Sequence, residues 1–399
     1  MLIFTLSNKT KVLYQGAFGR RQLSPSLPPP AAASASQPRQ VPPSPPPQLG
    51  EVRSKDFSFL LQPEIYHPLN LQNIPPAFRN SSKQPNPEVP IEELLAKGHF
   101  RAAAIAAAQE LTGSTVNGSS IDPHDGDRIF RLLYTRLACL TLIDATSLAA
   151  QEAKALEDLS DARRYIDDAT NEHLVPWELR VLHVRLQALG FGDPRRAVMS
   201  YHDLAREARD HIRKASLSHD NSARELWKSR LHELGIKVAG ALIEMDDLSG
   251  AAHHLGTLKD RGDGKLALSK ALLWLHLGDT RNARCCAGQC CEDNEDVENI
   301  ILALCDMADS NYEAALRKWQ GFDGSIADEM IGVNQAGRTI LEKLVDSGLS
   351  SHTLLFNLST TYELCSERNR ILKARLTEKV ANMEESPFGW EKTNADFKL

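Results

Sequence analysis

The feature that most restricts the fold of this chain is a pair of alanines twelve positions apart, which recurs three times. The pairs are Ala239 with Ala251, Ala271 with Ala283, and Ala303 with Ala315. Two helices of a hairpin can approach closely only where both carry small side chains, because larger ones hold the backbones apart. The second alanines also follow one another every 32 residues, which predicts a stack of similar helix pairs.

Other residues of the same units fit helix hairpins. Leu242 and Trp274 lie three positions after the first alanines and can fill the groove to the next pair, while Tyr312 lies three before Ala315. Turn residues fall between the paired helices at Met245-Asp246 and at Leu277-Gly-Asp279. An interval of 32 residues is close to the roughly 34 of tetratricopeptide repeats. We therefore expect an all-α, tetratricopeptide-like solenoid of helical hairpins.

Proline divides the chain into two regions. Seventeen of the twenty-one prolines precede residue 91, and residues 25–50 consist mostly of Pro, Ala, Ser and Gln. Such a composition cannot bury a core, so we expect residues 1–90 to form a disordered arm. Residues 91–399 follow helical periodicity almost without interruption and are expected to form the repeat domain.

The repeats are irregular at the front of this domain. Gly98 with Ala103 and Gly192 with Ala197 have the spacing of a hairpin turn and its second helix. The intervals of 94 residues from Ala103 to Ala197 and of 54 from there to Ala251 exceed one repeat. Extra or elongated helices are expected in both places.

The period also breaks near the end. The next second-helix pattern after Ala315 starts at Gly337, only 22 residues later, with Ala336 in the small position of a first helix. About eleven residues of a repeat are therefore missing at this junction, and natural shortening and a gene-model error both fit. A final helix pair is expected over 354–364 and 371–383, with a charged outer face that would cap the array.

One part of the N-terminal arm, residues 57–79, is rich in large apolar side chains. An apolar cluster in such an arm is either a docking peptide for a partner or a strap lying on its own folded domain. Both alternatives involve the same candidate partner-binding residues: Phe57, Phe59, Leu60, Tyr66, His67, Pro68, Leu69 and Phe78.

The sequence shows no pattern typical of catalysis or of a cofactor site. Cys285-Cys286 and Cys290-Cys291 fall on one face of an expected helix and lack the spacing of a zinc site, so we interpret them as buried thiols. Gly262-Asp-Gly-Lys265 lacks the first glycine and the final Ser or Thr of a phosphate-binding loop. We expect no enzyme activity, no cofactor and no metal.

Charge and hydropathy exclude two further classes of function. The net charge is −6, which disfavours binding to nucleic acid. No apolar run approaches the roughly eighteen residues of a membrane span, so direct membrane insertion is not expected.

The chain resembles, from about residue 57 to its end, the subunit 12 family of trafficking protein particle (TRAPP) complexes, in what looks like its fungal form. The resemblance lies in Leu341-Glu-Lys-Leu-Val-Asp-Ser-Gly348, Thr353-Leu-Leu-Phe-Asn-Leu-Ser359, Tyr362-Glu-Leu364 and the ending Gly389-Trp-Glu-Lys-Thr-Asn-Ala-Asp-Phe397. Tyr66-His-Pro-Leu69 with Ile74-Pro-Pro76 is similar to the short segment that precedes the family's helices. The junction at Ala336-Gly337 departs from the family, whose members continue there with an apolar first helix.

The resemblance implies a non-catalytic subunit of a vesicle-tethering complex in ER-to-Golgi traffic and autophagy. Its partners would be other TRAPP subunits and, indirectly, a Rab-type GTPase that the core subunits activate. It would be cytoplasmic and peripherally associated with Golgi membranes. Two alternatives share the fold: a peptide-binding adaptor or co-chaperone of another complex, and an organellar repeat protein. Residues 1–50 carry five basic side chains and no acidic one, which fits a mitochondrial transit peptide as well as a disordered tail.

Overall fold

The structure is a computed structural model, and it describes residues 55–399 apart from 115–119, 259–263, 289–294 and 322–332. Within the described residues it has eighteen α-helices, four short 3-10 helices and no β-strand. The expectation of an all-α chain is thus confirmed for this part of the protein. The disorder expected for the beginning of the arm, and Cys290 and Cys291, lie outside the described residues.

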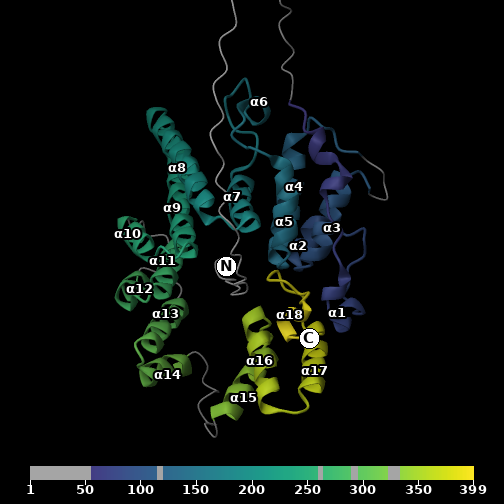
Figure 1. Ribbon diagram of the computed structural model, residues 1–399, viewed down its shortest axis with the longest axis vertical. Helices are drawn as coiled ribbons and strands as arrows, with labels where there is room; N and C mark the ends of the chain where they lie inside the picture. The colour runs from purple at the N-terminus through teal and green to yellow at the C-terminus, as the bar shows by residue number, and fades with distance from the viewer. Residues whose placement is uncertain (1–54, 115–119, 259–263, 289–294, 322–332) are drawn as a thin grey trace, which may run out of the picture. The chain divides into compact units, whose positions relative to one another are not determined.

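The helices follow one another along the chain as labelled in Figure 1. The 3-10 helices are Ser58–Leu61, Pro63–Ile65, Leu71–Asn73 and Lys154–Leu156. The α-helices are α1 (Pro76–Arg79), α2 (Ile91–Ala96), α3 (Phe100–Leu111), α4 (Gly126–Leu142), α5 (Thr146–Ala153), α6 (Ala162–Tyr165), α7 (Trp177–Phe191), α8 (Pro194–Leu217), α9 (Asn221–Glu244), α10 (Leu248–Thr257), α11 (Gly264–His276), α12 (Thr280–Ala287), α13 (Glu295–Ala308), α14 (Tyr312–Gly321), α15 (Val333–Asp346), α16 (His352–Cys365), α17 (Asn369–Ala381) and α18 (Asn394–Phe397).

The described residues from 55 onward belong to one compact unit, which includes the 57–79 segment and does not start after residue 90 as expected from the prolines. Residues 1–54 lie outside the described part. The boundary moves because the apolar side chains of residues 57–79 pack into cores made by the helices: Phe57 and Leu60 against α3 to α5, and Ile74 and Phe78 against α16 to α18.

Helices α9 to α14 pack as successive pairs: α9 with α10, α11 with α12 and α13 with α14. Each pair turns through one residue with left-handed backbone, namely Asp246, Gly278 and Ser310, so the turns repeat every 32 residues. After each, the next backbone N–H donates to the carbonyl five residues earlier, at 2.8–3.0 Å. This bond satisfies a carbonyl that the end of the first helix leaves unpaired.

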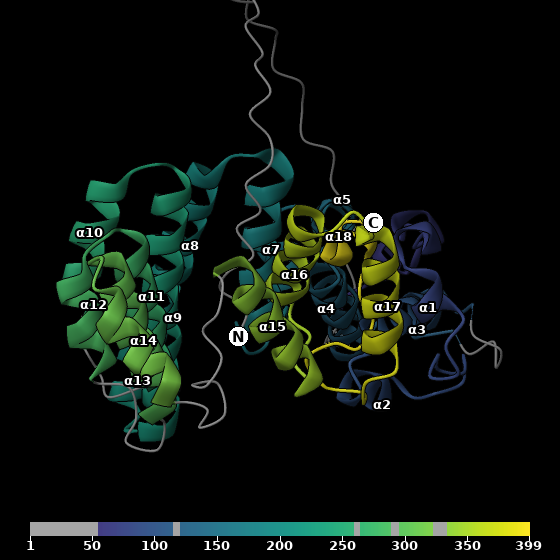
Figure 2. The same cartoon turned by 90° about the horizontal axis from the view of Figure 1, so that it is seen from below.

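The recurring alanines lie where these helices meet. All six are buried, from Ala239 to Ala315, and Trp274 is buried with them. Each second-helix alanine comes five residues after the left-handed turn residue. A methyl side chain at these points lets the paired backbones approach, which is the arrangement that the sequence spacing predicts. Figures 1 and 2 show the three pairs as neighbours in the green part of the chain.

The front of the helical region contains both kinds of irregularity that the long intervals predict. An additional pair, α4 and α5, turns at Asp144, which has φ of 60°, and places buried Ala149 five residues later. The expected turns at Gly98 and Gly192 join α2 to α3 and α7 to α8. Helices α8 and α9 are 24 residues long each, and their length accounts for the interval before Ala251.

Helix α15 runs through Ala336 and Gly337, from Val333 to Asp346, and packs against α16. No turn separates the two residues, which agrees with an expected junction that lacks the end of a first helix and its turn. That a repeat is shortened here stays a prediction. Helices α16 and α17 form the final pair, and the charged residues Arg370, Arg375 and Glu378 lie on its exposed face as expected for a solvated end.

Candidate partner-binding surfaces

The first half of the 57–79 segment is a strap on the chain's own helices. Phe57 is 1% exposed, and its ring lies edge-on to Phe130 of α4 with centroids 4.8 Å apart. Leu60 is fully buried, and its carbonyl accepts a hydrogen bond of 2.7 Å from the Tyr66 hydroxyl. Burial raises the pKa of that hydroxyl well above its usual range, so it remains a donor at every physiological pH.

A buried ion pair fastens the middle of the strap. Arg136 of α4 donates two hydrogen bonds to Glu152 of α5, at 2.7 and 2.9 Å. The same guanidinium donates to the His67 carbonyl at 2.7 Å, and Glu152 accepts from the His67 N–H at 2.9 Å. Side-chain exposures of 2% and 0% leave neither charge to water. The pair thus holds both backbone groups of one strap residue.

The second half of the strap packs against the C-terminal region. Phe78 is fully buried, with its ring 5.3 Å from that of Trp390 and 6.2 Å from that of Phe397. Ile74 is buried in the same cluster. The Tyr66-to-Pro76 segment and the Gly389-to-Phe397 ending, which carry much of the family resemblance, therefore lie in contacts that hold the fold together.

These positions correct the assignment of the segment as a partner-binding peptide. Phe57, Leu60 and Phe78 are buried within this chain, so a partner cannot contact them in this structure. Of the five remaining candidates, Pro68 is exposed. The other four are half-buried: Phe59, Tyr66, His67 and Leu69. Of the two alternatives that the sequence leaves open, the structure has the strap, because helices of the same chain offer the apolar surface that covers it.

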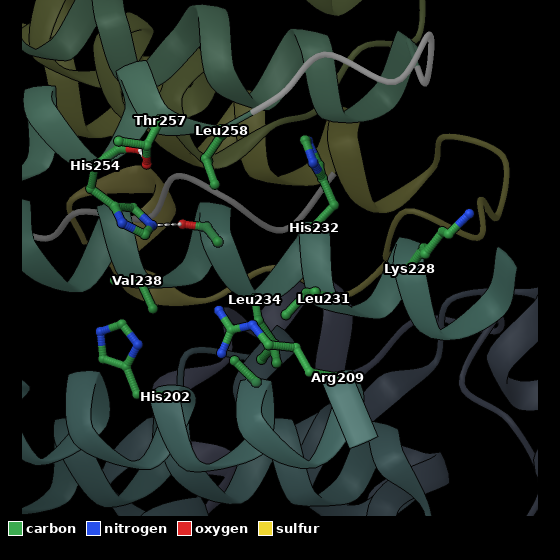
Figure 3. Close-up of a pocket in the computed structure, with 12 residues that line it drawn as sticks. His202, Arg209, Lys228, Leu231, His232, Leu234, Val238, His254, Thr257 and Leu258 are labelled. Atoms are coloured by element: carbon green, nitrogen blue, oxygen red, sulfur yellow. Dashed lines mark hydrogen bonds between the residues drawn. The ribbon is translucent and has the colours of Figure 1, made fainter. Parts of the chain in front are cut away.

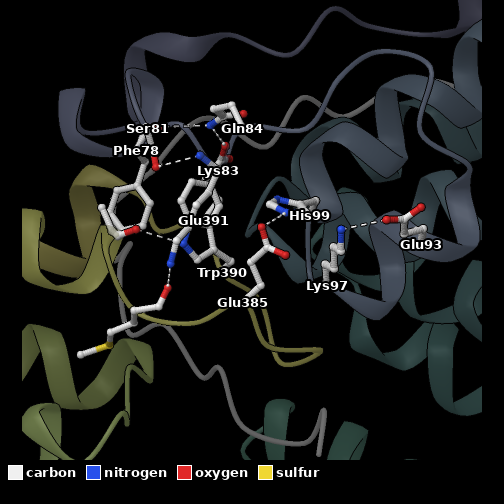
Figure 4. Close-up of polar contacts among 12 residues, drawn as sticks. Phe78, Ser81, Lys83, Gln84, Glu93, Lys97, His99, Glu385, Trp390 and Glu391 are labelled. Atoms are coloured by element: carbon white, nitrogen blue, oxygen red, sulfur yellow. Dashed lines mark hydrogen bonds and ion pairs between the residues drawn. The ribbon is translucent and has the colours of Figure 1, made fainter.

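Polar contacts join the C-terminal residues to the first helix pair (Figure 4). Arg101 of α3 lies 2.5 Å from Glu391, and His99 lies 3.2 Å from Glu385. The backbone N–H of Trp390 donates to the carbonyl of Gly98 at 3.2 Å. The turn at Gly98 requires glycine, since its φ is 74° and a Cβ there would lie 2.1 Å from a backbone oxygen of Ser386.

The very end of the chain contains a second histidine–carboxylate contact. The ring of His352 at the start of α16 lies 2.6 Å from Asp396, whose carboxylate also accepts from the Thr393 hydroxyl. Burial acts to raise the pKa of Asp396, but these hydrogen bonds outweigh it and hold the pKa below its usual range. The bond to Asp396 raises the pKa of His352. Asp396 and Thr393 also form the capping box of α18, so the contact joins the start of α16 to a carboxylate that α18 holds in place.

An open groove lies between α8, α9 and α10 (Figure 3). Its volume is about 380 Å³, and its apolar floor comes from Leu231, Leu234, Val238 and Leu258. Five basic or titratable side chains also line it: His202 and Arg209 from α8, Lys228 and His232 from α9, and His254 from α10. The remaining lining residues are Ala205, Gly235 and Thr257, so no acidic residue is among the twelve.

The groove exists because α10 is much shorter than the helix it covers. Helix α9 has 24 residues and α10 has 10, so α10 ends beside the middle of α9. At this point His254 Nε2 donates to the Gly235 carbonyl at 3.0 Å. Glycine lets the two helices pack closely there, since a Cβ on Gly235 would lie 2.6 Å from Cδ2 of Leu258 and would displace that side chain. The part of α9 before Leu234 extends beyond this contact and borders the groove with α8.

The basic side chains that line the groove differ in charge state. Burial lowers the pKa of His254, and the hydrogen bond to Gly235 only partly offsets this, so its ring is neutral at pH 7. Arg209 and Lys228 carry the positive charge, and Lys228 also bonds Glu225 at 2.7 Å. Sequence reasoning did not find this site, because its residues share no motif and come together only through unequal helix lengths.

The cysteine cluster is only partly described. Cys286 is buried as expected from its helical position, whereas Cys285 on the same helix is exposed. His253 and His254 lie on α10, the first exposed and the second half-buried. Among the residues that the structure describes, no group of three or more His, Cys, Asp or Glu side chains could hold a metal ion. None of the described helices combines the length and apolarity that a membrane crossing requires.

Comparison of the chain with protein-family models, with curated proteins and with solved structures finds no match.

Proposed function

We propose that this chain is a non-catalytic subunit of a TRAPP vesicle-tethering complex, and that it binds other subunits through tetratricopeptide-like helical repeats. The observation that carries the proposal is the coincidence of two periods. Left-handed turn residues and buried second-helix alanines both recur every 32 residues over α9 to α14. Repeated hairpins of this kind offer long rows of exposed helix faces, which suit protein binding better than chemistry on a small substrate.

The exposed apolar side chains support a role in binding proteins. Met199, Leu217 and Leu226 on the long α8–α9 pair are 70%, 78% and 51% exposed. Leu364 at the end of α16 and Phe388 beyond α17 are 81% and 79% exposed. Apolar side chains exposed to this degree within one region often mark protein interfaces. In our account the exposed apolar side chains of the α8–α9 pair, of the last turn of α16 and of the segment after α17 are therefore the surfaces that contact other subunits.

The strap supports the proposal in a different way. Its family-like residues hold the first helices and the last helices of the described region in place through Arg136, Phe78 and Trp390. We assign to them the positioning of the binding surfaces, and not the binding itself. Activation of a Rab-type GTPase would belong to core subunits, and the chain would lie in the cytoplasm on the surface of Golgi or early secretory membranes.

The test is affinity purification of the tagged full-length chain from its native cells, with partners quantified by mass spectrometry. We expect TRAPP core subunits in amounts close to that of the tagged chain. Two variants locate the contact: Leu217→Glu with Leu226→Glu on the long helix pair, and Leu364→Glu with Phe388→Glu at the end. Loss of the core from one variant supports the proposal, because all four side chains are exposed and their replacement leaves the fold intact. Recovery of chaperones or mitochondrial proteins without the core would reject it.

A further inference from the structure

The groove between α8, α9 and α10 has a composition that identifies the chemistry of a ligand. It combines an apolar floor with cationic side chains on opposite edges, and none of the described residues that line it is acidic. We propose that this groove binds an extended, acidic segment of a partner protein, in which Asp or Glu residues alternate with apolar ones. The inference rests on the proposed function as a protein-binding chain, and it names one site and one ligand class within it.

The positions of the side chains suit such a segment. In Figure 3, Arg209 on α8 and Lys228 on α9 flank Leu231 and Leu234. A peptide laid along the groove can place an apolar side chain on the leucines while carboxylates on either side meet the two cations. Paired contacts of this type fix both the position and the direction of the bound peptide.

The neighbouring charges leave the cations of the groove available. On α8, Asp203 and Asp210 pair with Arg206 and Arg213, and Glu207 pairs with Arg180 of α7. On α9, Lys228 shares Glu225 at the end of the groove, where both side chains are part-exposed. On α10, His254 is held by the Gly235 carbonyl and contributes a neutral surface. The groove therefore has a net positive potential on a chain whose net charge is −6.

The positive charge of the groove also distinguishes between possible ligands. The N-terminal 50 residues of this chain carry no acidic side chain, so they do not complement the groove. A nucleic acid would supply negative charge, but it would not use the apolar floor, and the net charge of −6 disfavours such a partner. An acidic protein segment satisfies both the charge and the apolar floor.

The experiment measures fluorescence polarisation of the labelled octapeptide Glu-Glu-Leu-Glu-Glu-Leu-Glu-Glu with the purified full-length chain. A second peptide has Gln in place of every Glu, and an oligothymidylate of equal charge is the nucleic-acid probe. The test variant is Arg209→Glu with Lys228→Glu. The matched control is Arg370→Glu with Arg375→Glu on α17, which changes the net charge equally at two exposed positions outside the groove. Circular dichroism compares the folds, and Arg209→Gln with Lys228→Gln replaces the test variant if it fails to fold.

We expect the acidic peptide to bind the wild-type chain and the control variant equally, and the test variant at least about tenfold more weakly, since two attractions become repulsions. Raising the ionic strength from about 0.05 to about 0.5 M should weaken binding by screening the same charges. The inference is wrong if the test variant binds the acidic peptide as well as the wild type does, if the Gln peptide or the oligothymidylate binds equally, or if no probe binds. Affinity purification separates the proposed function from the inference about the groove. If TRAPP subunits do not copurify with the chain but the acidic peptide still binds it, the proposed complex is rejected and the peptide-binding groove is retained.

Discussion

The ion pair between Arg136 and Glu152 gives the sharpest prediction about stability. Replacing Arg136 by Met leaves a carboxylate of 0% exposure without a cation and removes the donor to the His67 carbonyl. Breaking a buried pair from one side costs about 3–5 kcal/mol. Because the pair binds both backbone groups of His67, we expect much of this cost to appear as opening of the strap.

Hydrogen exchange measured by mass spectrometry reads that opening directly. A loss of about 3 kcal/mol corresponds to exchange about a hundredfold faster for the amides of residues 57–69. Arg128→Met is the matched control, since Arg128 also lies on α4 and pairs with Glu110 at 3.3 Å, but its side chain is 52% exposed. An exposed pair contributes about 0–1 kcal/mol, so the control should exchange almost as the wild type does.

The double variant Arg136→Met with Glu152→Leu completes the argument. It removes the unpaired charge but leaves the two His67 backbone groups without partners, at about 1–3 kcal/mol each if they stay buried. We expect exchange between that of the wild type and that of the single variant. If Arg136→Met accelerates exchange of the strap by less than about fivefold, the buried pair does not hold the strap and the reasoning is refuted.

Three further predictions concern other parts of the chain. Gly98→Ala should lower the free energy of unfolding by at least about 2 kcal/mol, whereas Gly278→Ala, with a similar φ but open space around it, should cost about 1 kcal/mol in urea unfolding. Burial lowers the pKa of His183 to about 4, whereas its pKa in the unfolded chain is about 6.5. Between these two pH values the unfolded chain binds a proton that the folded chain does not, so the free energy of unfolding falls as the pH drops from about 6.5 to 4. His183→Leu should remove this part of the pH dependence of stability. Ala283→Leu should lower the melting temperature by overpacking the α11–α12 contact, at about 1–3 kcal/mol, while Ala374→Leu at an exposed site of α17 should not; equal effects would contradict the role of the small residue.

The hairpins of α9 to α14 could be predicted from sequence because their signal is local. An alanine at a close helix crossing and a turn residue five positions before it follow from backbone geometry alone. Extra helices were expected between Ala103 and Ala197, but the pair α4 and α5 could not be located, because Leu137 and not an alanine lies twelve positions before Ala149. At Ala336-Gly337 the interruption of the repeat period coincides with a continuous helix, α15, and not with a turn.

The strap and the groove depend on contacts distant in sequence. The sequence leaves open whether Phe57 contacts a partner or its own domain, and only the placement of the helices shows that it is buried. Nor does any motif indicate that Arg136 is buried. The groove follows from the end of α10 beside Gly235, which no single stretch of sequence specifies. Sequence patterns thus predict the elements, whereas the pairing of distant elements decides which surfaces remain free to bind.

The measurement that tests the central claim most directly is reconstitution of the purified chain with a purified TRAPP core, followed by mass photometry. The account predicts a complex whose mass exceeds that of the core by 44.2 kDa for each bound copy of the chain. Two separate populations at micromolar concentrations, one at the mass of the core and one at that of the free chain, would contradict it.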